Sequence, residues 1–116
     1  MKIQFYKYQL DLYPVRVMIT FDQDFMERES CSPSKVKNAK GLTLTSGGYV
    51  IIYISPETFN WPTVAHESFH AADYVLDFTG MEHAPGGSNE HIAYLITWFA
   101  QRIEDSWHHY RSVTDV

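Results

Sequence analysis

Alternating apolar and polar positions in the first part of the chain predict β-strands. Ile3 and Phe5 alternate with polar neighbours in residues 2–8. After Pro14, apolar residues recur at every second position, at Val15, Val17, Ile19 and Phe21. A period of two places these side chains on one face of a strand, and that face is expected to lie in the core.

A hairpin is predicted next along the chain. Residues 42–45 and 49–54 flank the sequence Ser46-Gly47-Gly48, which suits a tight turn. The second arm is apolar throughout, as a central strand should be. The first arm alternates like a half-exposed edge strand and consists of Leu42, Thr43, Leu44 and Thr45.

The segment between the second strand and the hairpin is expected to hold one short helix and a loop. Asp22 is a suitable cap for a helix that ends near Ser30. Residues 30–41 are polar, contain Pro33 and show no periodicity, so they predict a mobile loop.

Helical periodicity in the second half predicts two helices. Asn60 and Pro62 suit the start of the first helix, and Gly80 suits its end. Its expected apolar stripe is Ala65, Phe69, Ala72 and Leu76. A Gly86-Gly87-Ser88 breaker precedes the second helix, whose stripe is Ile92, Leu95, Ile96, Phe99 and Ile103. Strands followed by helices predict a single α+β domain over residues 1–116.

Composition narrows the class of protein. The 116 residues are 45% hydrophobic and 20% charged, as in a globular domain. The net charge of −5 and the lack of a long basic run argue against nucleic acid as a partner. No stretch is apolar enough to span a membrane, and the first residues do not resemble a signal peptide. With Cys31 as the only cysteine, a cytoplasmic protein is expected, of undetermined oligomeric state.

The first predicted helix carries the motif His66-Glu67-Ser68-Phe69-His70. Residues four apart lie one turn apart on the same helix face, so both imidazoles can bind one metal ion. Glu67 points about 100° around the helix from His66, where it can act as general base for a metal-activated water.

A third ligand is expected from the second helix, at Glu90 in its first turn. Two histidines and one glutamate leave a coordination position for water, which is typical of catalytic rather than structural zinc. Asp73, one turn after His70, either supports a histidine or is simply solvated. Tyr94 either packs or donates a hydrogen bond to substrate or to His66. His91 is either an oxyanion donor or a surface residue.

The motif with Glu90 after nineteen intervening residues resembles the gluzincins, the thermolysin-like zinc metallopeptidases. By that resemblance, Asn89 supports the second histidine from outside the ligand set, and residues 42–45 border the cleft and pair with extended substrate. Thr43 or Thr45, but not both, is then expected to direct its N–H to the substrate. The length resembles that of the minigluzincins and of short zincin-like proteins of bacteria and phages.

The sequence therefore predicts a zinc-dependent peptidase with a protein or peptide substrate. Two alternatives stay open. The second helix is also similar to the glutamate helix of the ImmA/IrrE-like regulatory proteases. A zincin scaffold can also serve as a non-catalytic zinc-binding interaction module.

Overall fold

Four strands form one mixed sheet in the order β1-β2-β4-β3. The computed structural model describes residues 3–11, 13–80 and 90–114. The strands are β1 (Tyr6–Gln9), β2 (Arg16–Thr20), β3 (Gly41–Ser46) and β4 (Tyr49–Ile54). The helices are α1 (Gln23–Glu29), α2 (Pro33–Lys37), α3 (Trp61–Thr79) and α4 (Glu90–Thr114). The predicted α+β class is confirmed.

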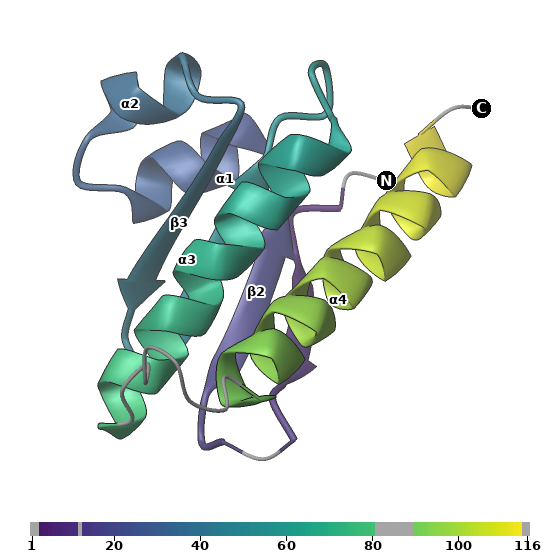
Figure 1. Cartoon of the computed structure of the whole chain (residues 1–116). Helices are drawn as coiled ribbons and strands as arrows, with labels where there is room; N and C mark the ends of the chain where they lie inside the picture. Colours follow the sequence, from purple (N-terminus) through teal and green to yellow (C-terminus); the bar gives the residue numbers. More distant parts are fainter. Residues whose placement is uncertain (1–2, 12, 81–89, 115–116) are drawn as a thin grey trace.

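Helices cover both faces of the sheet (Figure 1). On one face, α3 and α4 pack on the larger apolar cluster, which includes Val17, Ile19, Val50 and Ile52 of the sheet. On the other face, α1 and α2 pack on a smaller cluster that includes Ile51 and Tyr53. Neighbouring side chains of β4 point to opposite faces of the sheet, because side chains alternate along a strand. Both faces are covered by apolar clusters, so β4 is apolar throughout.

The hairpin is confirmed, with β3 as an edge strand and β4 in the centre. Strand β4 pairs with β3 antiparallel and with β2 parallel. Gly47 and Gly48 have φ angles of 55° and 84°. Positive φ at both central residues is what a two-residue hairpin turn needs to match the twist of its strands.

Two predictions in the first half need correction. The first strand begins at Tyr6 rather than at residue 2, within the described residues. Residues 33–37 of the expected loop form the short helix α2, because Val36 is completely buried in the cluster with α1. The helix expected after Asp22 is confirmed as α1, and Asp22 accepts from the backbone N–H groups of Asp24 and Phe25.

Helix α3 begins and ends as predicted, but its buried face differs. The Asn60 side chain accepts from the Thr63 N–H at 2.8 Å, and Gly80 ends the helix in the left-handed conformation. Ala65 and Phe69 of the expected stripe are exposed. The helix lies over the sheet and beside α4, so its contact surface is centred on Val64, Ala71 and Val75 instead.

Helix α4 buries the predicted residues Leu95, Phe99 and Ile103, with Ile92 and Ile96 half-buried. The expected breaker at 86–88 lies outside the described residues. No helix in the described ranges has the length and apolarity needed to cross a bilayer.

Candidate metal centre on helix α3

The two motif histidines converge on the exposed face of α3. Their Nε2 atoms lie 3.1 Å apart and their rings are 4.6 Å apart between centroids, at an angle of 77°. A tetrahedral zinc ion with Zn–N distances of about 2.0–2.1 Å separates its ligand nitrogens by about 3.3 Å. Since the two values differ by only a few tenths of an ångström, His66 and His70 fit a shared ion after a small side-chain movement.

Glu67 points away from solvent and toward the edge strand. Its side chain is only 5% exposed. The Thr43 hydroxyl donates to Glu67 Oε1 at 2.6 Å and also lies 3.3 Å from the Glu67 carbonyl oxygen. Thr43 is itself buried, so this pair fixes the carboxylate between α3 and β3. Charge-assisted hydrogen bonds of this length are among the stronger ones in proteins.

Gly41 lets β3 approach the helix at this point. A Cβ atom at position 41 would lie 2.9 Å from Glu67 Cγ, 3.2 Å from Glu67 Oε2 and 2.7 Å from Thr63 Cγ2. Contacts this short cannot be kept, so any larger residue would push the strand away from α3. Gly41 lies beside Oε2, the carboxylate oxygen for which no hydrogen bond to Thr43 is found.

The register of the hairpin shows which backbone groups of β3 face its open edge. The Ser55 N–H donates to the Lys40 carbonyl at 2.8 Å, so Lys40 and Ser55 form a hydrogen-bonded pair in line with the register of β3 and β4. Hydrogen-bonded pairs alternate along an antiparallel ladder. Leu42 and Leu44 therefore bond to β4, whereas Thr43 and Thr45 direct their N–H and C=O groups to the open edge.

The expectation that only one of these two threonines faces the substrate side is therefore wrong. Positions two apart in a strand point the same way. The side chains also alternate along the strand. Leu42 and Leu44 pack against the cluster with α1 and α2, whereas Thr43 contacts α3.

The third predicted ligand is not placed beside the histidines. Within residues 3–11, 13–80 and 90–114, no three His, Cys, Asp or Glu side chains are arranged to hold a metal ion. Glu90 is the exposed first residue of α4. Its assignment as a ligand stays a prediction, and Asn89 lies outside the described residues.

The remaining candidates lie on α3 and α4. Asp73 and Asp77 are exposed on the same face of α3 as the histidines. Tyr94 is 40% exposed on α4. His91 Nδ1 lies 3.3 Å from the hydroxyl of Tyr13, so its ring is directed to the β1–β2 connection.

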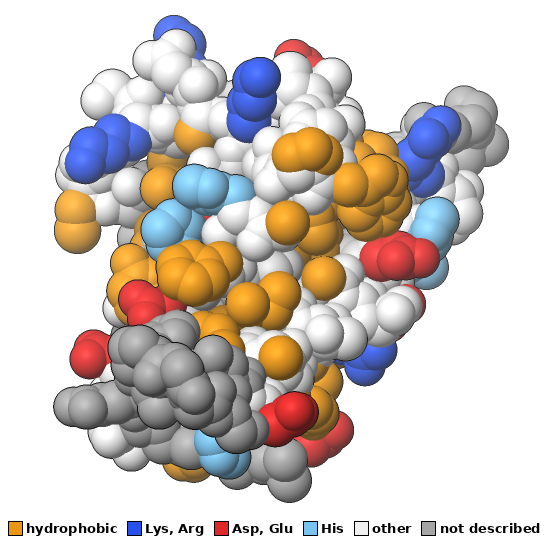
Figure 2. Space-filling model, viewed as in Figure 1, with side chains coloured by type: hydrophobic (Ala, Val, Ile, Leu, Met, Phe, Trp, Pro, Cys, Tyr) orange, Lys and Arg blue, Asp and Glu red, His pale blue; other side chains and the backbone are white. Residues whose placement is uncertain are grey.

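Phe69 lies beside His70, although the sequence pattern predicted that its side chain would lie in the core. Its ring is 45% exposed and lies 5.9 Å from the ring of His70 between centroids. Histidine and hydrophobic side chains are adjacent on the face over α3 and α4 (Figure 2). An apolar surface beside a histidine pair is suited to contact with a substrate or partner.

No protein-family model, curated protein sequence or solved structure matches the chain.

Proposed function

We propose that this protein is a zinc-dependent peptidase in which His66 and His70 bind the ion and Glu67 is the general base. The observation that carries the proposal is the 3.1 Å separation of the two Nε2 atoms on an exposed helix face. The Glu67 carboxylate, which Thr43 holds in place at the next position, and the open strand edge beside it support the same assignment. We propose Glu90 as the third ligand because its spacing matches that of the gluzincins.

Each group of the chain has a defined role in this proposal. Bound zinc would polarise the scissile carbonyl and lower the pKa of a water molecule to about 7. Glu67 takes the proton of that water and passes it to the leaving amine. Because Oε1 accepts from Thr43, Oε2 beside Gly41 is the atom that carries the proton.

Strand β3 is proposed to hold the substrate. The open-edge N–H and C=O groups of Thr43 and Thr45 can pair with an extended peptide, as in other cases of strand addition. Thr43 belongs to both parts of the site, since its backbone faces the edge while its side chain contacts Glu67. The peptide is thereby aligned along α3, next to the carboxylate.

A zinc-binding module without turnover is the second candidate. It is favoured by the burial of Glu67 and by the absence of a third ligand beside the histidines among the described residues. In that case zinc would fix the surface around α3 for a protein partner.

Digestion of a diverse peptide library separates the two candidates. Zinc-loaded wild-type protein should cleave the library, and Glu67→Gln should lower cleavage at least about 100-fold while retaining zinc. Glu67→Gln keeps the size of the side chain. Its melting temperature can be compared with that of the wild type to check that the variant is folded. Absence of cleavage by zinc-replete protein would reject the peptidase and leave the binding module.

A further inference from the structure

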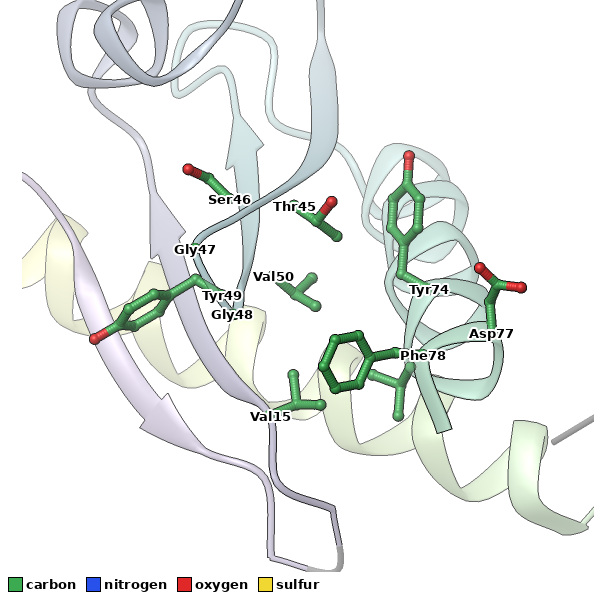
Figure 3. Close-up of a pocket in the computed structure, with 11 residues that line it drawn as sticks. Val15, Thr45, Ser46, Gly47, Gly48, Tyr49, Val50, Tyr74, Asp77 and Phe78 are labelled. Carbon is green, nitrogen blue, oxygen red and sulfur yellow. The ribbon is translucent and has the colours of Figure 1, made fainter. Parts of the chain in front are cut away.

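A partly open pocket lies between the last turns of α3 and the hairpin end of β3 and β4. Its volume is about 330 Å³, which is near the lower limit of small-ligand pockets. Figure 3 shows Phe78 reaching from α3 toward Val15 and Val50, with Thr45 on the strand side. Phe78 is 68% exposed although it is aromatic, so this wall of the pocket remains accessible to solvent.

The pocket is aligned with the open edge of β3. Thr45 lines it, and the backbone of Thr45 faces that edge. Thr45 follows Thr43 by two residues, about 7 Å along a strand. On α3, Phe78 follows His70 by eight residues, about 12 Å along a helix. The pocket therefore lies further along both β3 and α3 than the proposed metal centre.

A peptide added to this edge would place alternate side chains on the α3 side of the sheet. The residue opposite Thr43 lies next to Glu67, and the residue two positions further lies opposite Thr45, over the pocket. The spacing of two residues is the same whether the added strand runs parallel or antiparallel to β3.

We propose that this pocket selects a large apolar side chain two residues from the bond that is cleaved. The inference rests on the proposed peptidase function and assigns its substrate class. Val15, Val50 and Phe78 supply apolar walls. Asp77 lies at the same pocket and is exposed, and the chain carries a net charge of −5. Leucine, methionine or phenylalanine is therefore favoured there, and aspartate or glutamate is excluded.

The test uses a library of decapeptides and the variant Phe78→Ala. Because Phe78 is mostly exposed, its truncation should leave the fold intact. Mass spectrometry of the products should show enrichment of large apolar residues at one position two residues from the cut. Phe78→Ala should lower that enrichment roughly 10-fold and leave the other positions unchanged. Trp61→Ala, which removes another exposed α3 ring outside the pocket, is the matched control and should keep it.

Binding without turnover is measured by NMR of ¹⁵N-labelled protein to which the same library is added. A chelator removes zinc so that no peptide is cleaved. Amide shifts at Thr45, Gly47 and Phe78 are expected, and Phe78→Ala should abolish them. Binding without cleavage in zinc would retain the pocket and reject the peptidase. Cleavage with a preference unchanged by Phe78→Ala would retain the peptidase and overturn the pocket. Sedimentation that shows a dimer dissociated by Phe78→Ala would assign the pocket to a second copy of the chain and overturn the proposal.

Discussion

Replacing Thr43 with valine removes one hydroxyl from the contact between β3 and Glu67 and keeps the shape of the side chain. The lost interaction is the 2.6 Å hydrogen bond to Glu67 Oε1, with a weaker contact to the Glu67 carbonyl oxygen. Thr43 and Glu67 are 8% and 5% exposed. Water therefore cannot replace the missing donor unless β3 separates from α3.

The expected cost follows from the chemistry of the pair. A hydrogen bond to a charged group contributes about 1.5–3 kcal/mol, and the additional buried methyl group of valine offsets at most about 0.8 kcal/mol. Thr43→Val should therefore lower the free energy of unfolding by about 1–2 kcal/mol. For a domain of this length, the melting temperature should fall by roughly 3–10 °C.

Urea unfolding followed by tryptophan fluorescence measures this change. Thr45→Val is the matched control, because Thr45 lies on the same strand but is exposed, and its substitution should cost less than about 0.5 kcal/mol. In the proposed peptidase, Thr43→Val should also lower kcat roughly 10-fold, with zinc content unchanged, since Glu67 loses its fixed orientation. Equal unfolding midpoints for the two variants would refute the assigned hydrogen bond.

Three further predictions address the ligand set, the strand edge and the pH dependence of stability. Glu90→Ala should weaken zinc binding strongly and lower the zinc-dependent melting temperature; zinc affinity equal to that of the wild type would make Asp73 the next carboxylate to test. Thr45→Pro, which removes an N–H from the open edge, should reduce peptide cleavage while Thr45→Val does not, and equal cleavage by both would exclude pairing at this residue. Burial raises the pKa of Tyr53 and of Tyr6 above the ordinary value of 10.0. Above about pH 10, the unfolded chain therefore ionises these phenols while the folded chain still keeps them neutral. The unfolding free energy should be retained below about pH 10 and decrease above it, less so in Tyr53→Phe, as phenolate absorbance and urea unfolding would show.

Local signals were sufficient for the parts of the fold that depend on a few adjacent residues. The hairpin was predictable because its turn needs positive φ at two positions, which Gly47 and Gly48 adopt readily. The ends of α3 were predictable from Asn60 and Gly80. Helix α2 was not, because only Val36 of its five residues is buried and the segment shows no period.

Features that depend on tertiary packing were not predictable. The buried face of α3 includes Glu67 and Ser68, so a search for an apolar stripe selected the exposed Phe69 instead. The contact between Thr43 and Glu67 joins residues 24 positions apart. No periodicity indicates such a pair, although Thr43 was identified as part of the edge strand.

Zinc content per chain tests the central claim most directly. Protein purified without added metal, and again after dialysis against zinc and removal of excess ion, should contain close to one zinc per chain by elemental analysis. Glu67→Gln should contain the same amount, because Glu67 is held by Thr43 and is proposed as the general base rather than as a ligand. His66→Ala and His70→Ala should lose it. Wild-type protein without zinc after dialysis, or a histidine variant that retains the full amount, would contradict the proposed metal centre.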